Sequence, residues 1–372
     1  MPCEAALPGV DEAFRSYPSA VTPDPETRLR PVLLGALLAV GLGLVALFPD
    51  ALGLHTLSGA VHLSALRGLV TLAALGILLV AAGGLLSRRS RPFLTGFLGF
   101  GAVLVLASGG ILLGRGYSDP GVPAAETQPF APAAAPGSAP GSRLTVLTAN
   151  VLIGNAGYED LLREAAAAQA DVIALQETSP AIVEAVLERT GLSAEYEVAA
   201  VSIRSGVDTA ATILLVNPAL EPEEIDGGPL PFAAVGARTN VGDIYAVHTY
   251  APIDRSIRQF NWWRSVSESA KLCTTGAGTL VVGDFNATPD HRTLTGHTDC
   301  TDAATALGMG AVGTWPQTVG DREWPRGLGA AIDHQLFDPQ RFTAHRGWIL
   351  DIPGSDHRGV LVEYIVDAAR VP

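Results

Sequence analysis

The stretch Thr279–Asp290, an apolar run that ends in polar residues, constrains the fold more than any other part of the chain. Its first part, Leu280–Val282, is short, apolar and valine-rich, which predicts a buried strand. Gly283 allows the backbone to turn tightly at the end of that strand. Asp284 and Asn286 follow two positions apart, so an extended backbone places both side chains on the same side. On its own, such a motif is better explained as the start of a turn than as a functional site. Only further motifs elsewhere in the chain can favour a functional site.

Polar residues at the end of an apolar strand recur at five further places in the C-terminal part of the chain. These are Asn150, Gln176-Glu177, His248, Asp333-His334 and Ser355–Arg358. Each taken alone has a simple structural explanation, such as a turn, a solvated strand end or a core histidine. Six strand ends of this kind together indicate that their side chains converge at one rim of a sheet.

Residues 143–372 alternate between helical and strand patterns. The expected helices are Tyr158–Ala170, Pro180–Thr190 and Ser256–Leu272. The expected strands, besides the one at Leu280–Val282, are Leu144–Asn150, Asp171–Glu177, Tyr196–Ile203, Thr209–Val216, Ala233–Arg238, Asp243–Thr249, Ile332–Phe337 and Val360–Val366. Helices and strands alternate at first and strands then accumulate, which predicts a layered α/β fold with mixed sheets.

The side chains at these strand ends suit a hard metal ion. Glu177, Asp284, Asn150 and Asn286 offer the carboxylate and amide oxygens that Mg²⁺ or Mn²⁺ prefers. The sequence has no Cys/His spacing typical of a zinc site. It therefore predicts a divalent-cation site built from oxygen ligands.

The histidines supply groups for acid–base chemistry and for binding negative charge. His357, beside Asp356, suits a general base that activates water, and Asp333 could orient its imidazole. His248 and the two amides suit the stabilisation of a phosphoryl oxygen. The sequence has neither a serine nucleophile elbow nor a P-loop. Together these features favour metal-assisted hydrolysis of a phosphoester.

In their order along the chain, these motifs resemble those of the endonuclease/exonuclease/phosphatase superfamily, which includes the DNase I-like nucleases, the neutral sphingomyelinases and the inositol-polyphosphate phosphatases. Five motifs carry the resemblance: Asn150-Val151, Gln176-Glu177, Gly283–Asn286, Ile332–His334 and Ser355–His357. The resemblance covers residues 143–368 and does not extend to the N-terminal part. It implies a four-layered α/β sandwich with two packed mixed β-sheets.

The resemblance also implies roles for the residues that match the family's metal and phosphate positions. Glu177 would be the main ligand of Mg²⁺ or Mn²⁺, with Asn150 close by. Asp356 would hold either the metal or an imidazole. Asp284 and Asn286 would position the attacking water and contact the phosphate.

Further implied roles concern the histidines and one tryptophan. His357 would be the general base or a phosphate-contacting imidazole, and Asp333 would orient it. His248 matches a phosphate-contacting position. Trp315 falls where members often carry a substrate-facing loop, although a packed loop aromatic is an equally good explanation. His334 departs from the family pattern, so its role is open.

Three long apolar segments without a charged residue precede this domain. They are Pro31–Phe48, Gly68–Leu86 and Phe93–Gly114. At 1.5 Å per residue, each is about long enough to cross a hydrocarbon core of about 30 Å. Buried core helices or a cleaved signal peptide are the alternatives. Three such segments in succession, the first starting after a polar tail, favour three transmembrane helices.

The arginines around these segments predict their orientation in the membrane. Arg28 and Arg30 flank the first segment, and Arg88, Arg89 and Arg91 lie between the second and third. Positive residues stay in the cytoplasm, so the N-terminus is expected there and the C-terminal domain outside the plasma membrane. The expected organisation is a disordered tail over 1–30, a membrane domain over 31–115, a Pro/Ala-rich linker over 116–142 and an extracytoplasmic domain over 143–372.

The negative charge of the chain lies entirely in its C-terminal part. Residues 143–372 carry 16 Lys and Arg against 29 Asp and Glu, whereas residues 1–142 are balanced, and the net charge is −13. An acidic domain repels the backbone of nucleic acid. This charge disfavours a nucleic-acid partner without excluding one.

Two of the three cysteines, Cys273 and Cys300, lie in the domain expected outside the cell, where disulfides persist. A bond between them would close a loop of about 28 residues and stabilise the fold by roughly 3–4 kcal/mol. Two buried free thiols are the alternative. Cys3 is expected to be cytoplasmic and reduced.

These expectations favour a membrane-anchored, metal-dependent phosphoesterase that acts on a lipid-linked phosphate or a phospholipid headgroup at the outer membrane face. An extracellular DNA or RNA nuclease and a non-catalytic sensor or scaffold are the alternatives. The layout of three helices, a linker and an outward-facing domain also resembles bacterial membrane proteins linked to glycopeptide (teicoplanin-type) resistance. The Ala-, Gly- and Arg-rich composition fits a GC-rich bacterium.

Overall fold

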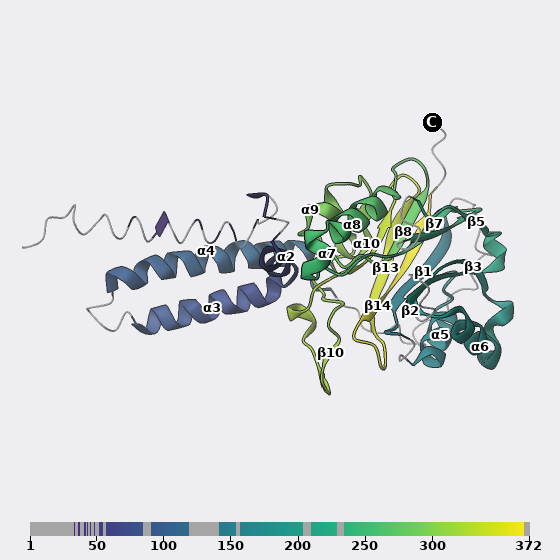
Figure 1. Cartoon of the computed structure of the whole chain (residues 1–372), viewed down its shortest axis with the longest axis horizontal. Helices are drawn as coiled ribbons and strands as arrows, with labels where there is room; N and C mark the ends of the chain where they lie inside the picture. Colours follow the sequence, from purple (N-terminus) through teal and green to yellow (C-terminus); the bar gives the residue numbers. More distant parts are fainter. Residues whose placement is uncertain are drawn as a thin grey trace, which may run out of the picture.

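The chain has two parts, a helical hairpin and an α/β domain, which meet at the base of the hairpin (Figure 1). The computed structural model describes residues 57–84, 91–118, 141–153, 157–203, 210–228 and 234–367, with isolated residues between 33 and 54. The expected tail over 1–30, most of the first predicted span and most of the predicted linker therefore lie outside the described residues.

Two six-stranded sheets form the centre of the α/β domain. The first has the order β13-β14-β1-β2-β4-β3, with β1 (Ser142–Asn150), β2 (Val172–Thr178), β3 (Glu197–Ser202), β4 (Ala211–Val216), β13 (Phe342–Asp351) and β14 (Arg358–Val366). The second has the order β5-β6-β7-β8-β12-β9, with β5 (Glu223–Ile225), β6 (Ala234–Thr239), β7 (Gly242–His248), β8 (Thr279–Asp284), β9 (Thr301–Asp302) and β12 (Asp333–Phe337). β1–β2 and β7–β8 are parallel and the other described neighbours are antiparallel, so both sheets are mixed, as predicted.

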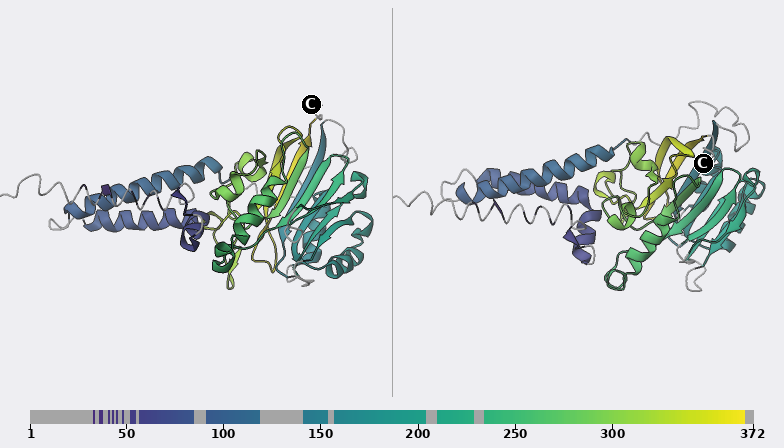
Figure 2. Two further views of the ribbon diagram at one scale, coloured as in Figure 1. Left: turned by 45° about the horizontal axis from the view of Figure 1, so that its top comes forward. Right: turned by 90° about the horizontal axis from the view of Figure 1, so that it is seen from above.

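The two sheets pack face to face over a shared apolar core (Figure 2). Val146 of β1 and Tyr364 of β14 contribute from the first sheet, and Ile244 of β7 and Val282 of β8 from the second. All four side chains are fully buried or nearly so. Burial of apolar surface at roughly 25 cal/mol per Å² is the main term that holds such sheets together. The core therefore fixes the strand ends of one sheet relative to those of the other.

Helices cover the outer faces of both sheets and complete four layers. They are α5 (Tyr158–Ala167), α6 (Pro180–Thr190), α7 (Asp254–Arg258), α8 (Asn261–Lys271) and α9 (Arg292–Thr295). The short helix α10 (Ala303–Ala306) instead contributes Ala303 and Ala304 to the core between the sheets. Leu162 of α5 and Val183 of α6 pack on the first sheet. Trp262 of α8 and Leu294 of α9 pack against Val281 of β8 in the second. This arrangement confirms the predicted sandwich.

Some element predictions are wrong. The helix expected over Ser256–Leu272 is broken into α7 and α8, because Phe260 between them adopts a left-handed backbone with φ 58°. Strand β13 was not expected at all. It lies at the edge of its sheet, its first half carries the half-exposed His345 and Arg346, and its buried apolar run, Trp348–Leu350, is only three residues long. The short edge strand β5 was missed for the same reason.

The hairpin consists of α3 (Arg67–Gly84) and α4 (Arg91–Arg115), and the short helix α2 (Ser58–Ala65) lies across its base. Within the described residues no single helix is both long and apolar enough to span a membrane. The pair α2 and α3 reaches the required length and composition together but is bent by 87°. The described helices therefore do not support the prediction of three transmembrane helices.

A disulfide joins Cys273 and Cys300, whose Cα atoms are 6.0 Å apart. Cys273 follows α8 and Cys300 immediately precedes β9, so the bond clips together the two flanks of the β8 segment. The alternative of two free thiols is wrong. Cys3 lies outside the described residues.

Candidate active site

The predicted strand ends meet at one rim to which both sheets contribute. His248, Asp284 and Asp333 lie in register across the neighbouring strands β7, β8 and β12. Asn150 ends β1 of the other sheet, and its amide nitrogen donates to the Asp284 carboxylate over 3.1 Å. The sheet packing thus brings together side chains that lie more than 130 residues apart in sequence. The polar end of the opening strand is part of a site and not simply a turn.

Asn150 links two carboxylates at the centre of this rim. Its Nδ2 lies 3.2 Å from Glu177 Oε1 and 3.1 Å from Asp284 Oδ2. Its Oδ1 accepts a hydrogen bond from the backbone N–H of Leu152 at 3.1 Å, which fixes the orientation of the amide. Asp284 is buried, whereas the Glu177 side chain is 25% exposed. The cluster is therefore reached from solvent on its Glu177 side.

His357 is held by Asp333 and faces Asp284. Its Nδ1 lies 3.0 Å from Asp333 Oδ2, and its Nε2 lies 3.8 Å from Asp284 Oδ2. The Ser355 hydroxyl accepts from the His357 backbone N–H at 3.0 Å and donates to the Asn150 carbonyl at 2.7 Å. This is the geometry that the predicted orienting role of Asp333 requires.

His248 presents a second imidazole to the same carboxylates. Its Nε2 lies 3.7 Å from Glu177 Oε1 and 3.8 Å from Asp284 Oδ2. The Asp284 carboxylate therefore has an imidazole nitrogen of His248 and one of His357 at the same distance. Two imidazoles beside carboxylates can donate hydrogen bonds to an anionic ligand at this rim.

Asn286 positions Asp284 from within the same loop. Its backbone N–H donates to Asp284 Oδ1 at 2.8 Å, and its Nδ2 lies 3.3 Å from Asp284 Oδ2. The Asn286 amide also donates to the Thr249 carbonyl at 3.3 Å, and the Trp262 indole N–H donates to the Asn286 carbonyl at 2.9 Å. The loop is thereby fixed to β7 and to α8.

The backbone of the site adopts conformations that side chains usually avoid. Glu177 and Asn286 have φ values of 55° and 47°, in the left-handed region. Each such residue costs on the order of 1–3 kcal/mol and persists only where the surroundings enforce it, commonly at functional sites. Gly283 has φ 146°, and an added Cβ there would collide with the Val247 carbonyl of the neighbouring strand. Only glycine allows β8 and β7 to approach so closely at this point.

Burial and neighbouring charges shift the pKa values of Asp284 and His357. Burial raises the pKa of the Asp284 carboxyl, while the neighbouring His357 and His248 oppose this effect. Burial lowers the pKa of His357, but the carboxylates of Asp333 and Asp284 outweigh burial and raise it to about 10. The rim therefore holds a cationic imidazole against buried carboxylates.

The residues present fit a divalent cation. Asp284, Asp333 and His357 each offer a ligand atom, and these atoms lie within 4.8 Å of one another. Asp333 Oδ1 is buried and has no hydrogen-bond partner among the described residues. An orphaned oxygen of Asp333 beside the Asp284 carboxylate is the environment that a hard cation satisfies.

Asp356 and Trp315 lie together at the edge of the site. The Trp315 indole N–H donates to Asp356 Oδ2 at 3.0 Å, and the Trp315 side chain is 37% exposed. Asp356 is thus engaged with the loop that carries Trp315, and its role as a metal ligand stays a prediction. The exposed indole suits contact with substrate, which also stays a prediction.

His334 is directed away from the rim. Its Nδ1 lies 3.1 Å from Asp302 Oδ1 and its Nε2 lies 2.9 Å from the Ala287 carbonyl oxygen. Both ring nitrogens are engaged and the side chain is buried. His334 therefore supports the loop after β8 and does not enter the site.

Arg358, to which the sequence assigned no role, organises the loop that carries the exposed tryptophan. Its Nη1 donates to the carbonyls of Gly313 and Pro316 at 3.0 and 3.2 Å. Its Nη2 donates to the carbonyls of Gln317 and Trp324 at 3.2 and 2.8 Å. Its Nε also donates to the Asp351 carboxylate at 2.8 Å. The sequence signals this role only by the position of Arg358 next to His357, because the four carbonyl acceptors are backbone atoms that any residue type could supply.

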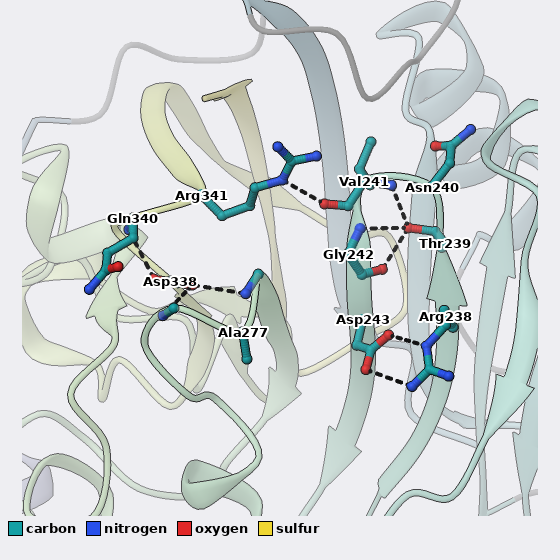
Figure 3. Close-up of a pocket in the computed structure, with 12 residues that line it drawn as sticks. Arg238, Thr239, Asn240, Val241, Gly242, Asp243, Ala277, Asp338, Gln340 and Arg341 are labelled. Atoms are coloured by element: carbon teal, nitrogen blue, oxygen red, sulfur yellow. Dashed lines mark hydrogen bonds and ion pairs between the residues drawn. The ribbon is translucent and has the colours of Figure 1, made fainter. Parts of the chain in front are cut away.

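A separate pocket of about 350 Å³ opens at the opposite end of the second sheet, and Figure 3 shows its lining. There the Asp338 carboxylate accepts hydrogen bonds from the backbone N–H groups of Gly276 and Gly278 at 2.8 and 2.9 Å. Arg238 is paired with Asp243 at 3.0 Å. These charged groups hold turns together, and none of the predicted site residues lines this pocket.

Two packed mixed sheets, with carboxylates, imidazoles and amides converging at one rim, define a metal-dependent hydrolase of phosphoester bonds. The sequence matches the profile of the Endonuclease/Exonuclease/phosphatase family over residues 147–357, more than half of the chain. The chain belongs to this family, which confirms the resemblance of its motifs. The resemblance of its overall layout to glycopeptide-resistance proteins stays a prediction.

Several solved structures are similar to this chain. One is TDP2 from D. rerio complexed with a single-strand DNA product, at 16% identity and TM-score 0.45, covering 60% of this chain and 99% of that chain. Another is a mannosyl-6-phosphatase from Bacteroides thetaiotaomicron, with the same identity, TM-score and coverage. A third is the 3′ phosphatase NExo from Neisseria bound to a product DNA hairpin, at 18% identity and TM-score 0.42, covering 59% and 98%. A search of curated proteins finds no match.

Proposed function

We propose that this chain is a membrane-anchored phosphoesterase that uses Mg²⁺, or Mn²⁺, and hydrolyses a lipid-linked phosphate or a phospholipid headgroup at the outer face of the plasma membrane. The observation that carries the proposal is the convergence of Glu177, Asp284, His248 and the Asp333–His357 pair at one rim. These groups are the ones that metal-assisted phosphoester hydrolysis needs.

Each residue has a role that follows from its contacts. A divalent ion, when bound, supplies positive charge that stabilises the phosphate. Glu177 would be its main ligand at the open side of the rim, close to Asn150, whose amide links Glu177 to the Asp284 carboxylate of the possible metal cluster. Asp284, fixed by Asn286, is placed to orient the attacking water and accept its proton.

The two histidines act on the phosphate. His357 is oriented by Asp333, and its Nε2 points into the site, where it can donate to a phosphoryl oxygen. His248 reaches the same place from β7.

Anchoring in the membrane is supported by the hairpin. The segments Gly68–Leu86 and Phe93–Gly114 contain no charged residue, and Leu79, Val80 and Leu106 are 68%, 77% and 75% exposed. A bilayer would remove this apolar surface from water. A first span at Pro31–Phe48 would complete the three helices.

The orientation is supported by charge and by the disulfide. In the sequence, Arg88 and Arg89 lie between the apolar segments Gly68–Leu86 and Phe93–Gly114, which favours a cytoplasmic location for the connection between these segments. The domain then lies outside, where the Cys273–Cys300 bond is stable.

A substrate panel tests the proposal. The full chain in detergent micelles is given dispersed phospholipid, a polyprenyl pyrophosphate, an inositol phosphate and plasmid DNA, each with and without Mg²⁺. We expect Mg²⁺-dependent turnover of a lipid substrate, lost in Glu177→Gln and retained in Glu184→Gln, an exposed position on α6 of the same residue type. Degradation of DNA without turnover of any lipid would instead make the chain a nuclease.

A further inference from the structure

A buried ion-pair cluster joins the base of the hairpin to the loop after β8. The Asp290 carboxylate accepts two hydrogen bonds from Arg67, at the start of α3, and two from Arg115, at the end of α4. The four distances lie between 2.5 and 3.0 Å. The Arg67 and Asp290 side chains are only 5% and 7% exposed. Paired arginine–carboxylate contacts combine strength with a fixed geometry, so one carboxylate holds both helices of the hairpin.

Further contacts surround this cluster. Val61 of α2 is fully buried in the same apolar cluster as Trp262 of the domain. The Val61 carbonyl oxygen lies 3.0 Å from Nε2 of His291, the residue after Asp290. Beyond the end of α4, the Ser118 backbone N–H donates to the Gly308 carbonyl at 2.8 Å. All three helices at the base of the hairpin therefore contact the domain.

Gly68 makes a close approach between α3 and the domain. An added Cβ would collide with the carbonyl oxygen of Gly327, in the short helix η6 (Arg326–Leu328), and would lie 3.1 Å from the Leu328 Cα. Gly76, further along the same helix, would place a Cβ with no atom within 4 Å. The hairpin packs on the domain at Gly68 with no room for a side chain, whereas its middle is open.

The two segments that contact the hairpin also border the active site. Asp290 follows Asn286 by four residues in the loop after β8. The segment of η6 is joined to the loop of Trp315, because the Ala330 backbone N–H donates to the Trp315 carbonyl at 2.6 Å. The Trp315 indole in turn contacts Asp356 at the rim. The base of the hairpin thus lies against both loops that flank the site, on the side of the domain from which the hairpin projects (Figures 1 and 2).

We propose that the hairpin and the catalytic domain form one docked unit, joined through the Asp290–Arg67–Arg115 cluster and the Gly68–Gly327 contact, which holds the active-site rim at the bilayer surface and selects phosphate groups carried by membrane lipid. This selection rests on the proposed function, whereas the docking rests on the contacts alone. In this arrangement, the contacts between the hairpin and the domain fix the distance of the domain from the membrane. The length of the Pro/Ala-rich linker does not set that distance.

The activity test uses Gly68→Leu, which wedges the hairpin from the domain, and Gly76→Leu as the matched control on the same helix. The full-length protein is reconstituted in phospholipid vesicles. Hydrolysis is measured on a vesicle-borne phospholipid and on the soluble diester bis(p-nitrophenyl) phosphate. We expect Gly68→Leu to lose roughly tenfold or more on the lipid, through lost positioning, while the rate on the soluble diester changes by less than about twofold. Gly76→Leu should match the wild type on both substrates.

Two outcomes would overturn this selection by docking. In one, Gly68→Leu keeps full activity on the lipid. In the other, it loses both activities equally, which would make the contact part of the catalytic fold and not a positioning device. A wild-type protein active on the soluble diester and inactive on every lipid would reject the proposed lipid substrate, and the docking would then be judged by the following measurement.

The second test needs no substrate. A protease site is inserted between Ala133 and Ala134 of the linker, and the full-length protein in vesicles is cleaved and washed at physiological salt. We expect the catalytic domain to stay with the membrane pellet in the wild type and in Gly76→Leu, and to be released in Gly68→Leu and in Asp290→Ala. Release of the wild-type domain in the first wash would reject the docked arrangement.

Discussion

His357 lies between two carboxylates, those of Asp333 and Asp284, and its charge depends on both. Its pKa is raised from the ordinary value to about 10, because the carboxylates outweigh burial. In the metal-free protein we expect the imidazole to stay protonated through neutral pH and to titrate near pH 10. The contribution of this ion pair to stability should be complete below about pH 6.5 and be lost as the pH rises through about 10. NMR of the His357 ring in the presence of EDTA measures this directly.

The matched variant for this measurement is Asp333→Asn, which keeps the shape of the partner and removes its charge. We expect the pKa of His357 to move down toward the ordinary range in that variant. A wild-type ring that already titrates near pH 6.5 would show that the carboxylates do not hold a proton on His357.

Arg358 provides a second test at the level of one side chain. Arg358→Lys retains the charge but loses the planar fork that reaches four backbone carbonyls. Buried carbonyls left without a donor cost roughly 1–3 kcal/mol, so the loop of Trp315 should loosen. We expect a higher KM with a smaller change in kcat, measured on whichever substrate the panel identifies.

Arg346→Lys is the control for Arg358→Lys, because Arg346 is half-exposed and lies 3.6 Å from Glu363. It should leave KM and kcat unchanged. If Arg358→Lys also leaves KM and kcat unchanged, the loop of Trp315 does not depend on the Arg358 guanidinium.

Single residues differ in how well the sequence predicts them. Glu177, Asp284, His248 and His357 could be found because each marks the end of an apolar strand. Asp290 could not, although it ends the opening motif. Its partners Arg67 and Arg115 lie 223 and 175 residues away, and a long-range ion pair leaves no local pattern.

At the level of elements, burial decides which strands and helices the sequence predicts correctly. Strands such as β8 and β14 are buried on both faces, so an apolar run predicts them. Strand β13 is an edge strand whose first half is exposed and charged, and its apolar run, Trp348–Leu350, is too short to predict a strand. The break at Phe260 between α7 and α8 is a backbone conformation that packing enforces, and the helical pattern continues across it.

The disulfide between α8 and β9 is an element-level constraint on the β8 segment. Replacing both Cys273 and Cys300 by serine should lower the stability of the domain by roughly 2–4 kcal/mol through the larger entropy of the unfolded chain. For a domain of this size each kcal/mol corresponds to roughly 2–4 °C in Tm. Thermal unfolding of the full chain in detergent measures the shift.

Reductant serves as the internal control for the disulfide prediction. It should lower the Tm of the wild type by the same amount and leave the double-serine variant unchanged. An unaltered wild-type Tm after complete reduction would mean that the bond does not stabilise the folded domain.

At the scale of the whole molecule, the chain divides into an apolar hairpin and an acidic domain. The sequence predicts this division, because composition changes sharply along the chain. It does not predict that the two parts are joined by buried contacts, since the predicted linker between them indicates only a tether. Only the structure shows that α2, α3 and α4 contact the loop after β8, through Val61, Arg67 and Arg115.

The central claim is that strand ends from two sheets form one metal-dependent hydrolytic site. The most direct test is hydrolysis of bis(p-nitrophenyl) phosphate by the full chain, after treatment with EDTA and again after addition of Mg²⁺. Asp284→Asn and the control Glu184→Gln are measured in parallel. We predict no activity in EDTA, recovery with Mg²⁺, and a loss of roughly 10²–10⁴ in Asp284→Asn alone. Activity that persists in EDTA, or an Asp284→Asn variant as active as the wild type, would contradict this assignment.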